Sequence, residues 1–322
     1  NLLHTADQSN GILSYPLYWV QSLVDYYLYT GDGELLGQLC DNACAKLDDA
    51  LEHFDDPRSP AFYGWDERLG AGFEDPGCPE SRMALKMLTI QTTGRFASAM
   101  AASGREDLAR KYSTLAEAKA RPYLSSPEVF DEYDIFALSD AINAGAVPSS
   151  LWNEIWQRTY SDRLQRVSYS PFNQYFVLNA MARMGRHAEA MNTIDDCWGG
   201  QIRYGATTFF EVFRPSWNLC SLGENDAPVN NQCGYTSLTH PWSAGVAKWL
   251  TEEVLGVKPE SPGFGTFSVT PHLTSGLSRV SGDVPTPKGI ISFSLDVREG
   301  TSCLVVPDGT QASLSLPLMG CR

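Results

Sequence analysis

The stretch from Trp198 to Trp217 reads WGGQIRYGATTFFEVFRPSW. It places a single carboxylate, Glu211, directly after two phenylalanines, and the motif THPW follows at residues 239–242. Aromatic faces can stack on sugar rings, and a well-placed carboxylate can transfer a proton during bond cleavage. The two motifs together indicate a sugar-binding site. The alternative is a surface glutamate beside an ordinary hydrophobic core.

The net charge and the hydrophobicity of the chain limit the kinds of molecule that it is expected to bind. The chain has 322 residues, a net charge of −14, a pI near 4.7 and 43% hydrophobic residues. Such a chain can build one large domain and a small one. An acidic protein is repelled by nucleic acids and by anionic membrane surfaces, so we expect neither as a partner. No apolar run is long enough for membrane insertion.

The cysteines favour an oxidising compartment, and we expect a secreted or extracellular protein. There are eight, and two pairs could close short loops as disulfides: Cys220 with Cys233, and Cys303 with Cys321. Cys40 and Cys44 lie one helical turn apart and are expected to find other partners or to stay free. The spacing typical of zinc sites is missing, so no metal is expected. The start of the sequence shows no secretion signal, which processing or truncation would explain.

Helical hairpins dominate the first part of the chain. Glycines at positions 31, 104 and 185 each follow an apolar segment and precede a polar helix start, which is the usual punctuation between helices. Repeated hairpins of this kind favour a helical array. From about residue 259 the pattern changes to alternating apolar residues, typical of antiparallel strands. We therefore predict an α-helical domain at 1–258 and a β-domain at 259–322. Helices are predicted near 15–29, 34–54, 80–103, 106–120, 133–143, 149–162, 171–184, 186–196 and 241–255.

Two long loops separate the predicted helices. One lies within residues 55–79, and the other carries Glu211. Each follows a helix that starts at a glycine turn, so both are expected at the opposite end of the array from those turns. Long loops gathered on one face are a common location for function. Asp195 and Asp196, at a helix end, could also reach this site.

Most of the chain resembles one known family, the bacterial-type α-L-rhamnosidases, which are six-hairpin glycosidases. The resemblance is carried by WGGQIRYGATTFFEVFRPSW, by SLTHPWSAGVAKWLTEEVLGVKPESPGFGTFSVTPHL and by VPTPKGIISFSL. It is strongest from about residue 170 to 289. The family implies a mainly α fold: an (α/α)6 six-hairpin toroid, here lacking its first helices, followed by a small antiparallel β-sandwich.

The resemblance also implies roles for individual residues. Glu211 matches the family's general base, which deprotonates the attacking water in an inverting mechanism. His240 matches a histidine close to the sugar, although a histidine that only satisfies a helix start is an equal alternative. The predicted substrate-binding residues are Trp65, Asp66, Trp198, Phe210, Trp217, His240 and Trp242.

The general acid is not clearly present. In the family it lies upstream of the helix that begins this chain, so it is expected from a missing N-terminal fragment or from a second chain that completes the toroid. Glu67, in the motif WDERLG, is an alternative acid, although its position corresponds to a later loop. Inverting chemistry needs two carboxyl groups about 6.5–9.5 Å apart. It requires no cofactor.

Two functions are weighed from the sequence, and a third possibility is a relative that acts on another sugar or on uronic acids. The first is an inverting glycoside hydrolase that releases terminal α-linked L-rhamnose or a similar deoxysugar. The second is a non-catalytic glycan-binding or structural extracellular protein built on the same toroid. Retention of Glu211 favours the first, and the missing acid segment favours the second.

Overall fold

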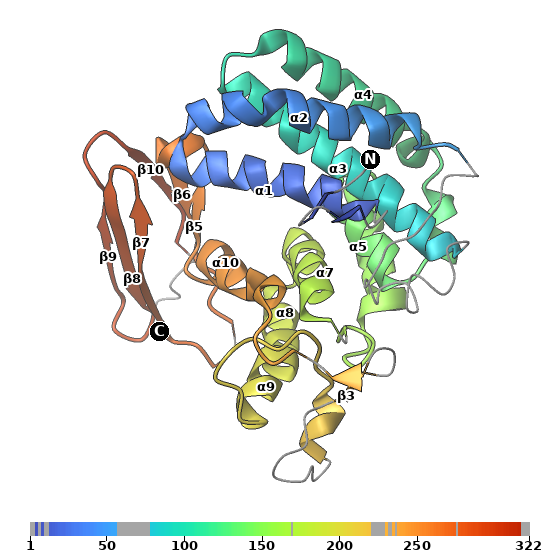
Figure 1. The fold of residues 1–322 in the computed structure, drawn as a ribbon. Helices are drawn as coiled ribbons and strands as arrows, with labels where there is room; N and C mark the ends of the chain where they lie inside the picture. Colours follow the sequence, from blue (N-terminus) through green and yellow to red (C-terminus); the bar gives the residue numbers. More distant parts are fainter. Residues whose placement is uncertain are drawn as a thin grey trace. The chain divides into compact units, whose positions relative to one another are not determined.

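The computed structural model describes most of the chain. The described residues are 4–5, 8–9, 13–56, 78–168, 170–219, 229–230, 234–235, 237–274 and 276–316. Helices make up most of the described residues, and strands gather toward the C-terminus, as Figure 1 shows. This is the predicted order of elements.

The helices agree with the predicted ranges to within a few residues, apart from a short additional one. They are α1 (Ser14–Thr30), α2 (Gly33–Glu52), α3 (Pro79–Ala102), α4 (Glu106–Ser125), α5 (Ile135–Asn143), α6 (Trp152–Ile155), α7 (Pro171–Arg183), α8 (His187–Ile194), α9 (Gly200–Arg203) and α10 (Gly245–Trp249). The additional helix is α9. Three helices, α6, α8 and α10, continue as single π-helical segments, Trp156–Tyr160, Asp195–Gly199 and Leu250–Val254. A π segment adds a residue per turn and commonly marks a local irregularity in a helix.

Glycine turns join the helical hairpins as predicted. Gly31, Gly104 and Gly185 all have positive φ, at 70°, 76° and 73°. A residue without a Cβ adopts this left-handed conformation at the end of a helix without steric strain. After the first turn, the Asp32 carboxylate accepts a hydrogen bond from the N–H of Leu35 (2.9 Å), which caps the start of α2.

The chain forms two compact units. The first comprises Asn1–Tyr15, Leu51–Gln91 and Ala118–Val246. The second comprises Pro16–Ala50, Thr92–Glu117 and Ala247–Arg322. The first unit contains Glu211 and the segments around it, while the second contains the β-region.

The β-region consists of two three-stranded sheets. One has the order β10 (Gln311–Leu314), β6 (Thr266–Val269), β5 (Val257–Pro259), and the other β7 (Arg279–Thr286), β8 (Gly289–Asp296), β9 (Thr301–Val305). Buried residues of both sheets share one hydrophobic core with Leu255 and Phe264. Two sheets on a shared core form the predicted sandwich.

One detail of the sandwich differs from the prediction. Strands β10 and β6 pair in parallel, whereas all other pairs are antiparallel among the strands that the structure describes. The alternating apolar pattern predicts a strand but not the direction of its partner. The predicted domain boundary between 258 and 259 falls within β5 and stays a prediction.

The described cysteines form no disulfide. Cys40, Cys44, Cys78, Cys197 and Cys303 are free thiols. Cys303 is exposed on β9, which does not support its predicted bond to Cys321. Cys321 and the other predicted pair, Cys220 and Cys233, lie outside the described residues.

Candidate active site

The site is built by two segments that hydrogen-bond to each other. The first follows α9, where Gly205, with φ at 101°, ends the helix and lets the chain continue toward Glu211. The N–H of Glu211 donates to the carbonyl of Ser237 (2.8 Å), and the N–H of His240 donates to the carbonyl of Phe209 (2.8 Å). These bonds bring the two sequence motifs, far apart in the chain, to the same place in the first unit.

The Glu211 carboxylate is held by the backbone and remains partly open to solvent. Its Oε2 accepts a hydrogen bond from the N–H of Ser237 (3.0 Å), and the side chain is 24% exposed. Among the described residues, no hydrogen bond to its other oxygen is found. A carboxylate fixed through one oxygen keeps the second for an incoming group, which is the arrangement that a proton acceptor needs.

His240 lies beside this carboxylate. Its Nδ1 is 4.0 Å from Oε2 of Glu211, and its side chain is 31% exposed. This distance is longer than a hydrogen bond, so the two groups are neighbours rather than a bonded pair. A ligand between them could contact both.

Trp242 stabilises the backbone at Glu211. Its indole N–H donates to the backbone carbonyl of Glu211 (2.9 Å). Its ring stacks on Phe172 of α7, with ring centroids 5.4 Å apart and planes at 20°, and lies 4.5 Å from the His240 ring. Trp242 therefore joins Glu211, His240 and α7 in one contact group.

Two other predicted contacts with sugar are buried in the structure. Trp198 and Phe210 are each 5% exposed. The indole N–H of Trp198 donates to the carbonyl of Ser243 (3.0 Å), and the N–H of Phe210 donates to the side-chain oxygen of Gln201 (3.0 Å). Both side chains are buried, and their assignment to the sugar pocket stays a prediction.

Trp217 belongs to a neighbouring aromatic cluster. Its ring packs against Phe213 (5.6 Å between centroids) and Tyr204 (6.2 Å). Phe209, by contrast, is 38% exposed next to Glu211. The only sequence signal for Phe209 is its position in the motif. Trp65, Asp66 and Glu67 lie outside the described residues, so their predicted roles stay predictions.

Two residues of this group were not predicted from the sequence. Ser237 acts through its backbone N–H, which any residue except proline offers, so no side-chain pattern points to it. Phe172 follows the proline at the start of α7, and its partner Trp242 is distant in sequence. Neither contact has a local sequence signature.

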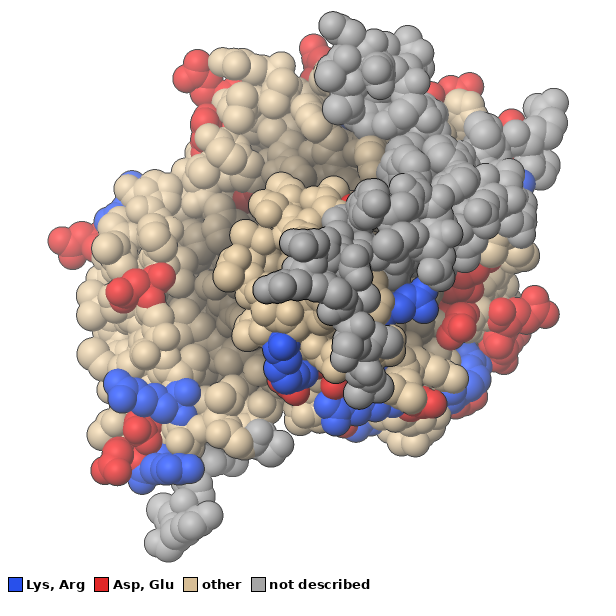
Figure 2. Space-filling view, turned by 60° about the horizontal axis from the view of Figure 1, so that its bottom comes forward, with Lys and Arg blue, Asp and Glu red and all other residues tan. Residues whose placement is uncertain are grey.

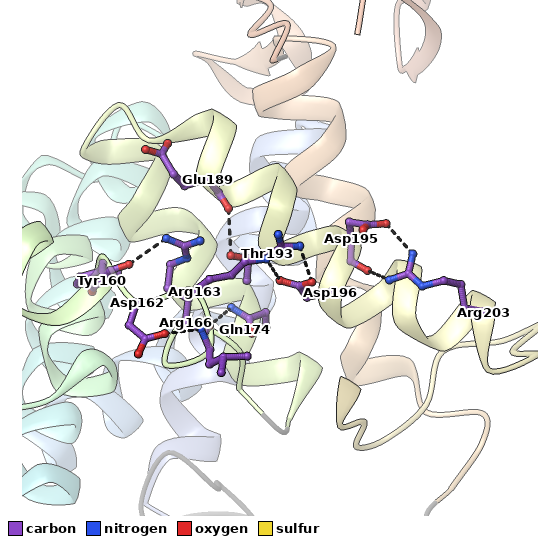
Figure 3. A network of polar contacts seen from close by, with 11 residues as sticks. Tyr160, Asp162, Arg163, Arg166, Gln174, Glu189, Thr193, Asp195, Asp196 and Arg203 are labelled. Atoms are coloured by element: carbon purple, nitrogen blue, oxygen red, sulfur yellow. Dashed lines mark hydrogen bonds and ion pairs between the residues drawn. The ribbon is translucent and has the colours of Figure 1, made fainter. Parts of the chain in front are cut away.

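Asp195 and Asp196 form ion pairs with arginines. Asp196 accepts two hydrogen bonds from Arg163, at 2.7 Å each, and Asp195 pairs with Arg203 at 2.9 Å. Figure 3 shows the two pairs on opposite sides of the helix end that carries the aspartates. The Arg163–Asp196 pair is bidentate, which fixes its geometry, and Arg203 also donates to the backbone carbonyl of Asp195. The two pairs connect the turn after Tyr160 and helix α9 to the end of α8.

The charged residues on one face of the molecule include both signs. On the face shown in Figure 2, Lys and Arg residues lie beside Asp and Glu residues, with no continuous basic patch among the described residues. None of the helices that the structure describes has both the length and the hydrophobicity needed to span a lipid bilayer.

Comparison with known proteins agrees with the resemblance seen in the sequence. Residues 256–320 match the family described as bacterial alpha-L-rhamnosidase C-terminal domain. The chain is 37% identical over 120 residues to an alpha-L-rhamnosidase of Alteromonas sp. (strain LOR), an alignment that covers 37% of this chain and 11% of that relative.

Solved structures extend the likeness over nearly the whole chain. The alpha-L-rhamnosidase of Dictyoglumus thermophilum superposes with a TM-score of 0.78 at 16% identity, covering 98% of this chain and 36% of that one. The Streptomyces avermitilis alpha-L-rhamnosidase, solved in complex with L-rhamnose, gives 0.74 at 16% identity, covering 97% and 30%. At this identity the likeness shows the fold. The predicted resemblance and the predicted fold class, mainly helical with a small β-region, are confirmed, and the chain spans only a fraction of the length of these relatives.

Proposed function

We propose that this chain carries the general base of an inverting glycoside hydrolase that releases terminal α-linked L-rhamnose or a similar deoxysugar. The observation that carries the proposal is the Glu211 carboxylate, held by the Ser237 N–H beside His240 and partly open to solvent. The rhamnosidase resemblance of the chain supports the choice of sugar, as does the rhamnose complex of one structural relative.

In this mechanism Glu211 deprotonates a water molecule that attacks the anomeric carbon. The carbon–oxygen bond to the leaving group breaks on the opposite face, and the general acid protonates the leaving oxygen. His240, 4.0 Å from the base, is in a position to hydrogen-bond a sugar hydroxyl. The exposed ring of Phe209 offers an apolar face next to the base.

The acid is assigned to a segment outside these 322 residues, on an N-terminal part of the same protein or on a second chain, with Glu67 as the alternative. The assembled enzyme is proposed to act outside the cell. The competing function is a non-catalytic glycan-binding or structural protein that keeps the fold without the acid.

The test is hydrolysis of an aryl α-L-rhamnoside by the native, complete protein, with Glu211→Gln as the variant. Because the amide cannot accept the proton, we expect a loss of about 10²- to 10⁴-fold in rate. NMR of the first product anomer checks inversion. Absence of hydrolysis by the complete protein, together with measurable rhamnose binding, would favour the non-catalytic function.

A further inference from the structure

A sulfur cluster lies in the second unit, unrelated to the proposed sugar site. Cys40 and Cys44 sit one turn apart on α2, and Met100 of α3 lies against Cys40. The Cys40 thiol lies 3.7 Å from the thioether sulfur of Met100. Cys40 and Met100 are buried, at 5% and 0% exposed, whereas Cys44 is half-buried.

We infer that Cys40, Cys44 and Met100 form a binding site for a soft monovalent metal ion, Cu(I) or Ag(I). Thiolates and thioethers are the ligands that select such ions. With metal–sulfur bonds of about 2.3 Å, two sulfurs of a trigonal site are about 4 Å apart. The separation of Cys40 and Met100 is close to this value without any rearrangement.

The same geometry disfavours a disulfide between the two cysteines. A disulfide needs Cβ atoms about 3.5–4.5 Å apart. Neighbours four residues apart on a helix have Cβ atoms about 5–6 Å apart. A disulfide would therefore distort α2. Zinc is also disfavoured because Met100 offers a thioether, whereas zinc binds thiolate, imidazole and carboxylate ligands.

The charges around the cluster suit an anionic complex. Binding one monovalent ion to two thiols releases two protons and leaves a net charge of −1 on the metal and its ligands. Gly37, one turn before Cys40, has no Cβ, and the guanidinium of Arg105 occupies that space: a Cβ there would meet its Nη2 at 2.8 Å. A fixed cation near Cys40 offsets the negative charge.

The Cys40 thiol is buried. Burial, and next the neighbouring Cys44 thiol, raise the pKa of Cys40 to about 11, while Arg105 acts in the opposite direction. At neutral pH the thiol is protonated and a poor nucleophile. A soft metal ion displaces such protons because its bonds to sulfur are strong.

The local framework around Cys44 is also fixed. The hydroxyl of Tyr112 on α4 contacts the backbone carbonyl of Cys44 (3.4 Å) and donates to Asp48 (3.0 Å), one turn further along α2. Lys111 pairs with the same aspartate at 2.8 Å. The α2 backbone is thus anchored where the ligand side chains emerge.

The test titrates the reduced, complete protein with Cu(I) in the absence of oxygen, against a chromophoric Cu(I) chelator. We expect the Cys44→Ser variant to bind one Cu(I) ion fewer per chain. The Met100→Leu variant, which conserves side-chain volume, should bind that ion with at least tenfold lower affinity. The matched control is Cys303→Ser, which removes an exposed thiol and should leave this ion in place. Circular dichroism confirms that each variant is folded.

Three results would overturn the inference. These are the absence of copper binding by the reduced wild-type protein, equal copper retention by Cys44→Ser, and loss of the bound ion in Cys303→Ser. A Zn²⁺ titration should show no comparable site dependent on Cys44. Since neither Glu211 nor a sugar is involved, failure of this test leaves the proposed hydrolase unaffected.

Discussion

At the scale of single residues, two tryptophans make the same kind of hydrogen bond in different places. The indole of Trp242 donates to the Glu211 carbonyl in the half-open site, and that of Trp198 donates to the Ser243 carbonyl in the core. Trp242→Phe keeps the stack on Phe172 and should lower the free energy of unfolding by about 1 kcal/mol. It should also reduce rhamnoside hydrolysis by the complete protein several-fold, because the backbone at Glu211 loses a support.

Trp198→Phe is the matched control for Trp242→Phe. It leaves a buried carbonyl without its donor, so we expect a larger loss of stability, about 1–3 kcal/mol, with hydrolysis unchanged at temperatures where the protein is folded. Urea denaturation and initial rates measure the two effects. Equal losses of hydrolysis in both variants would contradict this and would support the predicted contact of Trp198 with the sugar.

Asp55 provides a prediction about pH. A hydrogen bond from Lys119 and a weaker one from Lys86 hold the pKa of Asp55 below its ordinary value of 3.8, against a smaller opposite effect of burial. A lowered pKa in the folded state stabilises the protein above the unfolded-state pKa, and this contribution disappears as the pH falls through the folded-state pKa. Because Asp55 is 67% exposed, the effect of Asp55→Asn should be at most about 1 kcal/mol.

Urea denaturation at neutral and at strongly acidic pH measures this effect. Asp55→Asn should be less stable than the wild type at neutral pH and equal to it at acidic pH. Arg110→Gln is the control, since its pair with Asp107 is 75% and 95% exposed and should contribute nothing at either pH. A deficit of Asp55→Asn that persists in acid would contradict the ion-pair explanation.

The residues of the candidate site show what sequence can and cannot predict at this scale. Glu211, His240 and Trp242 lie together as the two motifs predict. Trp198 and Phe210 have the same aromatic character but lie in the core. An aromatic residue is equally suitable for packing and for sugar stacking. Only the course of the backbone decides which face it presents, and that course depends on long-range hydrogen bonds such as the one from the Ser237 N–H to Glu211.

At the scale of elements, glycine substitutions in the second unit should rank by geometry. Gly104 has positive φ, and no atom lies within 4 Å of the position that a Cβ would take. Gly104→Ala should therefore lower the free energy of unfolding only by the strain of a left-handed backbone, about 1–2 kcal/mol. Gly31→Ala should cost more, since its Cβ would also meet the Cα of Gly263 at 3.3 Å. Gly256→Ala should cost most, because its Cβ would meet the Thr270 backbone at 2.3 Å.

The control for this series is a glycine substitution that should raise the free energy of unfolding. Gly94 lies inside α3 without positive φ, and its Cβ would touch the Cβ of Ala116 at an ordinary 3.9 Å. Gly94→Ala should therefore stabilise the protein by up to about 1 kcal/mol through helix propensity. Chemical denaturation of the four variants gives the ranking. A destabilised Gly94→Ala variant, or a neutral Gly256→Ala variant, would refute the geometric argument.

The elements were predictable where the signal is local. Apolar spacing and turn glycines predict the long helices and their hairpins, including the positive φ of Gly31, Gly104 and Gly185. The π segments that extend α6, α8 and α10 have no such signal, because they continue an apolar helix pattern with a small change in hydrogen bonding. The parallel pairing of β10 with β6 joins strands far apart in the chain, which no local pattern encodes.

At the scale of the whole molecule, the question is whether the two carboxyl groups of the proposed reaction belong to one chain. The solved relatives are longer: this chain covers 36% and 30% of two of them. Glu211 is the proposed base in either case. Paired variants, Glu67→Gln and Glu211→Gln, distinguish the possibilities in the 322-residue chain and in the complete native protein.

If the acid lies outside these residues, the 322-residue chain alone should bind rhamnose without hydrolysing an aryl rhamnoside. The complete protein should then hydrolyse it, and Glu67→Gln should change the rate less than about tenfold while Glu211→Gln costs about 10²- to 10⁴-fold. If Glu67 is the acid, the chain alone is active and Glu67→Gln is as damaging as Glu211→Gln. An aryl leaving group of low pKa needs little protonation, so loss of the acid should affect it less than a poor leaving group, whereas loss of the base affects both. Comparing the two leaving groups therefore assigns each carboxyl group its role.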